Sequence, residues 1–128
     1  MTLFLIDDNS MFLQVTREKL KPYCSDIYIF SSYKDALNNL ELKPDIIFLD
    51  YLFDEKTNGT KIMKKIRKAN PSQRVVIVSG QESPSTVHQL IQIGVQDYIV
   101  KDENYIEKMV EVINEQDQSK LATNPRAM

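Results

Sequence analysis

The amino-acid sequence predicts an α/β fold, a doubly wound parallel sheet of five strands with helices on both faces. Two observations support this prediction. Five apolar runs rich in Ile, Val, Phe and Tyr recur along the 128 residues, and several are apolar at consecutive positions. Such runs are typical of strands that are covered on both faces, as in a parallel sheet. Segments with helical periodicity separate the runs, and right-handed crossovers between parallel strands then make a doubly wound sheet the expected result.

The expected elements alternate in the order strand then helix, five times. The strands are the apolar runs at 3–6, 27–30, 45–50, 74–79 and 97–100. The helices, whose apolar residues recur with helical spacing, are expected at 10–20, 34–42, 60–69, 85–93 and 104–116. Asn9 or Ser10 can cap the first helix, and Gly94 stands where a C-cap glycine would follow the fourth.

The length of the chain favours a single domain, because 128 residues can bury a core without a disulfide or a structural metal. The helical periodicity of the last segment is lost near Asn114. We therefore expect residues 1–116 to form the domain. Residues 117–128 are expected to be the end of a helix followed by a frayed tail or the stub of a linker.

The composition is that of an ordinary soluble protein, with 42% apolar and 27% charged residues. The formal net charge of −2 and the absence of a basic block argue against nucleic acid or an anionic membrane as a direct partner. Cys24 is the single cysteine and cannot form an internal disulfide. The first apolar run stops at Asp7, too early for a signal peptide, and no run approaches the roughly 20 apolar residues of a membrane span. These features predict a cytoplasmic protein.

Polar residues stand at the carboxyl ends of four of the five expected strands. Asp7 and Asp8 follow the first strand, Asp50 ends the third, Ser79 ends the fourth and Lys101 follows the fifth. In open α/β sheets the ligand crevice lies beyond the carboxyl ends of the strands. The five side chains come from four separate segments, so we expect them to meet in that crevice.

The chemistry of such a group follows from its charge. Three clustered carboxylates cannot all ionise comfortably without a cation, and hard oxygen ligands suit Mg²⁺. An aspartate can attack phosphorus, and phosphoryl transfer depends mainly on positioning and charge neutralisation. We therefore expect Asp7 and Asp8 to hold the metal and Asp50 to be the nucleophile. Lys101 would add positive charge, and the hydroxyl of Ser79 would donate to a phosphoryl oxygen.

The motifs IDD, IIFLD, VSG and GVQDYIVK occur in this order, and over roughly residues 2–116 the chain resembles the receiver domain of two-component response regulators, of the chemotaxis-Y-like kind. The resemblance implies a flavodoxin-like fold with strand order 2-1-3-4-5. It implies that Asp8 binds Mg²⁺ directly and Asp7 through water, and that Asp50 is phosphorylated. The backbone carbonyl of Leu52 would complete the protein ligands of the metal.

The resemblance also implies a two-state switch rather than an enzyme acting on an external substrate. A sensor histidine kinase or a histidine phosphotransfer protein would donate the phosphoryl group, and the chain would catalyse only its own phosphorylation and dephosphorylation. Ser79 would be the switch hydroxyl, Tyr98 the switch aromatic and Lys101 the partner of the phosphate. A downstream protein, or an output domain outside this sequence, would read the face formed by the fourth helix, fifth strand and fifth helix. Phosphorylation-dependent homodimerisation through that face is common in the family and is left open here.

Three positions depart from the family pattern. Asp54 stands where a proline is common, and Gly59 lies nine residues after Asp50, one more than is usual. Lys101 is followed by Asp102 instead of a cis proline. A cis bond before a residue other than proline costs about 3 kcal/mol. We therefore expect either a trans Lys101–Asp102 bond with a rearranged loop or a strained cis bond.

Other functions on this architecture remain to be compared with the switch. A degenerate receiver would bind partners without phosphorylation. A phosphatase of the haloacid-dehalogenase kind would carry an acid two residues after the first aspartate, where this chain has Asn9. A flavin mononucleotide binder would carry a glycine- and hydroxyl-rich phosphate loop after the first strand, but the acidic segment DDNSM repels phosphate unless a metal intervenes.

Overall fold

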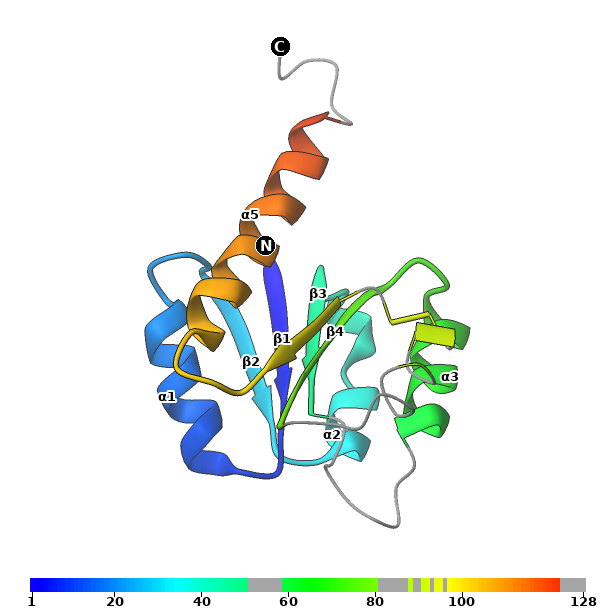
Figure 1. Ribbon diagram of the computed structural model, residues 1–128. Coiled ribbons are helices and arrows are strands. Elements are labelled where there is room, and N and C mark those ends of the chain that lie inside the picture. Colours follow the sequence, from blue (N-terminus) through cyan, green and yellow to red (C-terminus); the bar gives the residue numbers. More distant parts are fainter. Residues whose placement is uncertain (51–58, 81–87, 89–90, 93, 96, 123–128) are drawn as a thin grey trace.

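The computed structural model describes residues 1–50, 59–80, 88, 91–92, 94–95 and 97–122. Within these residues, five parallel strands form one sheet in the order β2-β1-β3-β4-β5, which confirms the predicted topology (Figure 1). The strands are β1 Thr2–Ile6, β2 Asp26–Phe30, β3 Ile46–Leu49, β4 Arg74–Ser79 and β5 Asp97–Val100. Their bounds match the predicted apolar runs to within one residue, and the central strands β1, β3 and β4 are buried on both faces of the sheet.

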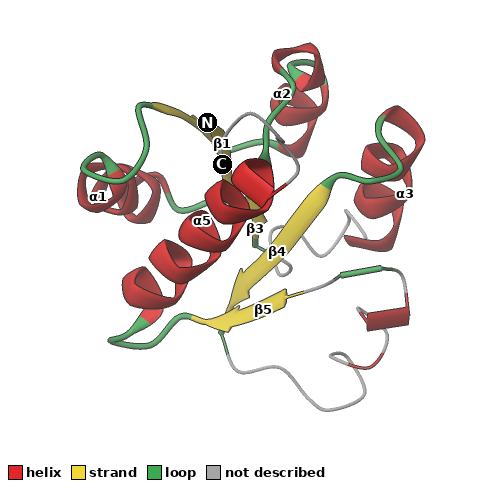
Figure 2. Cartoon of the chain, turned by 90° about the horizontal axis from the view of Figure 1, so that it is seen from above, coloured by secondary structure: helices red, strands yellow, loops and turns green. Residues whose placement is uncertain are grey.

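Helices cover both faces of the sheet. The described helices are α1 Ser10–Leu20, α2 Tyr33–Leu37, α3 Gly59–Ala69 and α5 Tyr105–Ala122, with a 3₁₀ turn η1 at Leu40–Leu42. Seen from above, α1 and α5 lie on one face, and α2 and α3 lie on the other (Figure 2). Most of the helix predicted at 85–93 lies outside the described residues. Among those residues, no helix is both long and apolar enough to cross a membrane.

The consecutive apolar residues of the central strands serve two separate cores. In β1, Leu3 and Leu5 pack under α1 and α5, whereas Phe4 and Ile6 pack under α2 and α3. Successive side chains of a strand point to opposite faces, so a strand between two helical layers is apolar at every position. This division holds the carboxyl ends of the central strands rigidly in place.

The second helix differs from the prediction for 34–42. Its α-helical part ends at Leu37, and the 3₁₀ turn that follows ends at Leu42, with Lys43 as its C-cap in the left-handed region at a φ of 55°. Asn38 and Asn39 have low helix propensity, and Nδ2 of the Asn39 side chain donates a hydrogen bond to the Asp35 carbonyl oxygen at 2.7 Å. The asparagine side chain thus competes with regular helical hydrogen bonding and breaks the helix.

The last helix is longer than its apolar periodicity predicted. Helix α5 runs to Ala122, beyond the end of the helix predicted at 104–116, and its last turns extend beyond the sheet (Figure 1). The segment that follows Asn114 is rich in Glu, Gln, Lys, Leu and Ala, which favour helix without any packed face. The boundary between a domain at 1–116 and a tail at 117–128 remains a prediction.

Candidate functional site

The sheet brings the predicted acidic residues together at its carboxyl edge. The Asp7 amide donates to the Phe30 carbonyl oxygen at 3.1 Å, and the Asp50 amide donates to the Ile6 carbonyl oxygen at 2.9 Å. These bonds continue the parallel ladders one residue past the ends of β1 and β3. Carboxylate oxygens of Asp7, Asp8 and Asp50 all lie within 4.8 Å of one another, as the strand-end positions predicted.

Two of the three carboxylates are buried. Asp7 is 2% exposed and Asp50 is 6% exposed, whereas Asp8 is exposed to solvent. Removing two neighbouring carboxylates from water is costly unless positive charge is close by. Part of that charge comes from Lys101, whose Nζ lies 2.6 Å from Oδ2 of Asp7 and 3.6 Å from Oδ2 of Asp50. Burial of the ammonium opposes its charge, but the hydrogen bond to Asp7 and the charges of both aspartates raise the pKa of Lys101.

The turn from β1 into α1 orients the carboxylate of Asp7. Its Oδ1 accepts a hydrogen bond from the Asn9 amide at 2.9 Å, and the Asn9 side chain accepts one from the Phe12 amide at 3.0 Å. Asn9 is therefore the N-cap of α1, rather than Ser10. The two bonds hold Asp7 toward Lys101 and connect the acidic pair directly to the first turn of the helix.

The backbone of Asp50 is held by a residue that sequence reasoning did not select. The buried hydroxyl of Tyr33 donates to the Asp50 carbonyl oxygen at 2.7 Å. Tyr33 begins α2, and Ser32 caps this helix by accepting a bond from the Asp35 amide at 3.3 Å. An aromatic residue at the start of a short helix carries no signal that points to a residue 17 positions away.

Residues at the ends of β4 and β5 complete the described part of the site. Ser79 is fully buried, and its carbonyl oxygen accepts a hydrogen bond from the Lys101 amide at 2.7 Å. Tyr98 is half-buried in β5, and its hydroxyl donates to the Gly80 carbonyl oxygen at 2.6 Å. The structure therefore places Ser79 at the end of β4, Tyr98 on the adjoining strand β5, and Lys101 directly after β5. Leu52, the predicted carbonyl ligand, lies outside the described residues, as does Asp54.

The peptide bond between Lys101 and Asp102 is trans, since the described part of the chain contains no cis peptide bond. Of the two predicted alternatives, the structure shows the trans bond. The Asp102 amide donates to the Val100 carbonyl oxygen at 2.8 Å, and Oδ1 of Asp102 accepts from the Asn104 amide at 2.8 Å. This tight turn leads into α5 and still lets the Lys101 ammonium reach the carboxylates.

The donor set at this edge fits a small hard cation. All three side chains offer carboxylate oxygens, and two of them are buried beside each other, where they need positive charge beyond that of one lysine. Mg²⁺ prefers oxygen ligands and is usually held by one or two carboxylates with waters in the remaining positions. The acidic pocket of Asp7, Asp8 and Asp50 can therefore bind a divalent metal ion.

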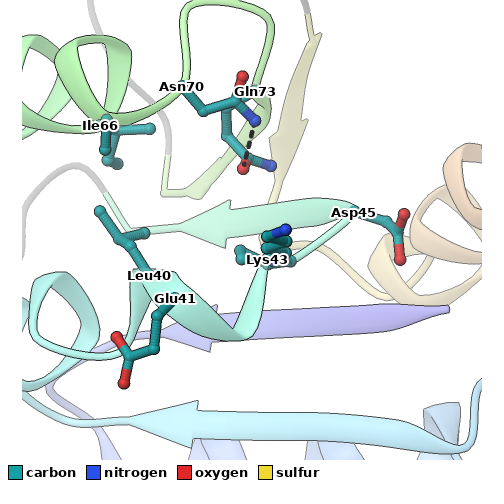
Figure 3. Close-up of a pocket in the computed structure, with 9 residues that line it drawn as sticks. Leu40, Glu41, Lys43, Asp45, Ile66, Asn70 and Gln73 are labelled. Atoms are coloured by element: carbon teal, nitrogen blue, oxygen red, sulfur yellow. Dashed lines mark hydrogen bonds between the residues drawn. The ribbon is translucent and has the colours of Figure 1, made fainter.

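A pocket lies near the amino ends of β3 and β4, opposite the acidic site, and none of the predicted site residues line it. This pocket of about 600 Å³ opens between η1 and α3 (Figure 3). Its lining is mixed, with Leu40 and Ile66 on the apolar side and Asn70 bonded to Gln73 on the polar side. The acidic site and this pocket are thus separate features of the molecule.

Together, the doubly wound parallel sheet and the acidic pocket beside Lys101 define an α/β protein with a candidate metal site at the carboxyl edge of its sheet. The family model of the response regulator receiver domain matches residues 3–114, and the chain belongs to this family. Receiver domains are the signalling switches of two-component systems, and they interact with histidine kinases and output domains.

Individual relatives agree with this membership. The chain is 30% identical over 102 residues to a probable C4-dicarboxylate response regulator of Halalkalibacterium halodurans, covering 77% of this chain and 44% of that protein. It is 36% identical over 61 residues to the chemotaxis protein CheY of Thermotoga maritima, covering 48% and 50% of the two chains. The matched part thus spans half or less of the length of these curated relatives.

A solved structure shows the same fold. A response regulator receiver domain protein of Clostridium thermocellum superposes with a TM-score of 0.81 at 22% identity, covering 95% of this chain and 98% of that chain. At this level of identity the likeness concerns the fold, and it agrees with the five-stranded parallel sheet and its order.

Proposed function

We propose that this receiver accepts a phosphoryl group on Asp50 from a sensor histidine kinase or a histidine phosphotransfer protein, with Mg²⁺ as cofactor. The observation that carries the proposal is the position of the buried Asp50 carboxylate. It lies within 4.8 Å of the carboxylate oxygens of Asp7 and Asp8, and 3.6 Å from Nζ of Lys101. A nucleophilic carboxylate, a cation site and a fixed ammonium are the groups that phosphoryl transfer to an aspartate requires.

In the proposed reaction, a carboxylate oxygen of Asp50 attacks the phosphorus of a phosphohistidine. The new O–P bond forms as the P–N bond breaks, and the imidazole leaves with the bonding electrons and takes up a proton from water. Asp8, Asp7 through water, Asp50 and the Leu52 carbonyl would hold Mg²⁺, which would supply positive charge near the phosphoryl oxygens. Lys101 pairs with the same oxygens, and its contact with Asp7 keeps the ammonium next to Asp50 beforehand. Water later hydrolyses the acyl phosphate and resets the site.

The proposed switch uses Ser79 and Tyr98. The Ser79 hydroxyl donates to a phosphoryl oxygen, and the segment at the end of β4 moves toward the site. Tyr98 turns inward and gives up its hydrogen bond to the Gly80 carbonyl oxygen, a contact that differs between the two states. Phosphorylation can shift the population of states only through such differential contacts.

The face formed by the fourth helix, fifth strand and fifth helix is proposed to change on phosphorylation. In the cytoplasm it would bind a downstream protein or an output domain of a longer regulator. Cys24 is a free, buried thiol, which suits a reducing compartment. Partners of this kind do not need the chain to contact nucleic acid or membrane directly. Homodimerisation of the phosphorylated form is tested separately, by light scattering with and without phosphorylation.

Intact-mass measurement after incubation with acetyl phosphate tests the proposal. One added phosphoryl group is expected in the presence of Mg²⁺, and none is expected without the metal or in Asp50→Asn. Beryllofluoride, which mimics the phosphoryl group, should bind the wild-type protein and not the variant. If neither adduct forms in the wild-type protein, the chain is a degenerate receiver that binds its partners unmodified.

A further inference from the structure

We infer that Phe12 is a positioning residue for Lys101, and that its ring holds the Lys101 ammonium beside the carboxylates. This inference rests on the proposed role of Lys101 as the partner of the phosphoryl group. Phe12 contributes no polar atom to the site, and sequence reasoning treated it as part of an amphipathic helix. The assignment comes from the contacts that surround the lysine.

The Lys101 ammonium lies between carboxylates and an aromatic face. Its Nζ is 2.6 Å from Oδ2 of Asp7 and 4.5 Å from the centroid of the Phe12 ring. The side chain of Lys101 is 26% exposed, so solvent only partly screens these contacts. An ammonium at this distance over a ring face is attracted by the ring quadrupole, most strongly where water is excluded.

The same turn that orients Asp7 also places the ring. Asn9 donates its amide hydrogen to Asp7 and accepts the amide hydrogen of Phe12, so the carboxylate and the ring are two and three residues from one capping residue. The backbone of Phe12 is therefore fixed relative to Asp7. Lys101, which lies 94 positions after Asp7 in the sequence, contacts both the Asp7 carboxylate and the Phe12 ring.

A residue of helix α5 packs against the ring. Tyr105 stacks on Phe12 with a centroid separation of 5.2 Å and an interplanar angle of 30°. The Tyr105 hydroxyl and Oγ1 of the fully buried Thr16 are hydrogen-bonded at 3.0 Å, which joins α5 to α1. Phe12 is thus held by its own helix and by α5 together.

A fixed ring matters because a lysine side chain has many rotamers. Without the ring, the ammonium would exchange between the carboxylates and solvent, and it would have to be ordered again for each phosphoryl transfer. Restricting it beforehand favours the state in which charge is neutralised. From the usual strength of such contacts, we expect loss of the ring to slow phosphorylation of Asp50 about threefold to tenfold.

The first test uses Phe12→Leu and Phe12→Tyr in the full chain. The rate constant of phosphorylation by acetyl phosphate with Mg²⁺ should fall in Phe12→Leu and return toward the wild-type value in Phe12→Tyr. In lysine-labelled protein, the ε-protons of Lys101 should be shifted upfield by the ring current in the wild type, and this shift should vanish in Phe12→Leu. Circular dichroism checks that both variants fold.

A second series separates the ring's charge distribution from its packing. Phenylalanines that carry increasing numbers of fluorine atoms at position 12 keep the shape of the ring and weaken its attraction for a cation. Phosphorylation should slow stepwise along the series. Phe30 provides the matched control, since its ring packs on Phe4 at 4.8 Å and the same substitutions there should leave the rate unchanged. A rate that does not change with fluorination at position 12 would overturn the inference, even if Phe12→Leu is slow, because packing alone would then explain the leucine variant.

The proposed phosphorylation of Asp50 and the inferred role of Phe12 are refuted by different results. Absence of any phosphoryl adduct in the wild-type protein would refute the proposed function. The ring-current measurement needs no phosphorylation, so ordinary ε-proton shifts for Lys101 in the wild type would refute the placement of the ammonium over Phe12 by themselves.

Discussion

At the scale of single residues, the site is a balance of charges removed from water. Asp7 and Asp50 are almost fully buried, and one lysine contacts both of them. Together with Asp8 the group carries more negative than positive charge when no metal is bound. Sites of this kind store unfavourable electrostatic energy that serves function at the expense of stability.

Asp50→Asn should therefore stabilise the metal-free protein. The amide has nearly the same shape as the carboxylate but removes one charge from the cluster, and we expect a gain of about 1 kcal/mol in the free energy of unfolding. Urea denaturation in the presence of a chelator measures this gain. Asp35→Asn, on the exposed side of α2, should change the stability very little, and a loss of stability in Asp50→Asn would contradict the charge argument.

Cys24 offers a second residue-scale prediction, this time of pH dependence. Burial raises the pKa of its thiol, and Sγ donates to the Met1 carbonyl oxygen at 3.1 Å. Because the folded-state pKa is raised, the stability that the protonated thiol contributes is fully present below the unfolded-state pKa and is lost as the pH rises through the folded-state pKa. Alkylation of the folded chain should accordingly begin at a higher pH than alkylation in urea, and coincident pH profiles would show that the thiol is not protected.

At the scale of elements, the strands are tied together at the end of the sheet opposite the site. Arg74 of β4 binds Asp97 of β5 at 3.0 Å and Glu115 of α5 at 2.9 Å. Its side chain is mostly buried, whereas that of Glu115 is largely exposed. Burial opposes the charge of the guanidinium, but its hydrogen bonds to Glu115 and Asp97 raise the pKa of Arg74, so it stays charged.

Arg74→Met should destabilise the fold by about 1–2 kcal/mol, since the partly buried carboxylate of Asp97 loses its partner. Glu115→Gln should cost less than about 0.5 kcal/mol, because exposed ion pairs contribute little. Denaturant titration measures both changes. The rate of phosphorylation should be the same in the two variants, and a slower rate in Arg74→Met would show that this end of the sheet is coupled to the site.

At the scale of the whole molecule, folding and metal binding should be linked. The three carboxylates come from two segments that are far apart in the chain and meet only when β1 and β3 pair. An ion bound by this arrangement binds the folded state and not the unfolded chain. Mass action then makes the stability of the fold depend on the concentration of the ion.

Mg²⁺ should therefore raise the thermal unfolding midpoint in a concentration-dependent way. At a concentration 100 times the dissociation constant, the expected stabilisation is about 2.7 kcal/mol. Differential scanning fluorimetry measures it, with sodium chloride at matched ionic strength as the control. Asp8→Ala removes an exposed carboxylate of the cluster and should flatten the dependence, whereas an equal rise in that variant would place the ion elsewhere.

Much of this protein follows from its sequence alone. Strand bounds and the meeting of Asp7, Asp8 and Asp50 were predictable, because burial of the central strands on both faces leaves consecutive apolar residues and parallel strands bring their ends to one edge. The strand order was predicted from the resemblance to receiver domains, and the structure confirms it. The early end of α2 and the extension of α5 were not predicted. In both, backbone preferences of residues without a packed face decided the outcome, which apolar periodicity does not report.

Only the tertiary structure decided how the site is supported. The contact of Lys101 with Asp7 joins residues 94 positions apart, that of Tyr105 with Thr16 spans 89 positions, and the trans bond before Asp102 depends on the turn into α5. Local sequence determines which residues stand at the ends of strands, since periodicity and turn signals act over a few residues. Which side chains then hold those residues depends on how distant elements pack, and packing is a property of the folded chain.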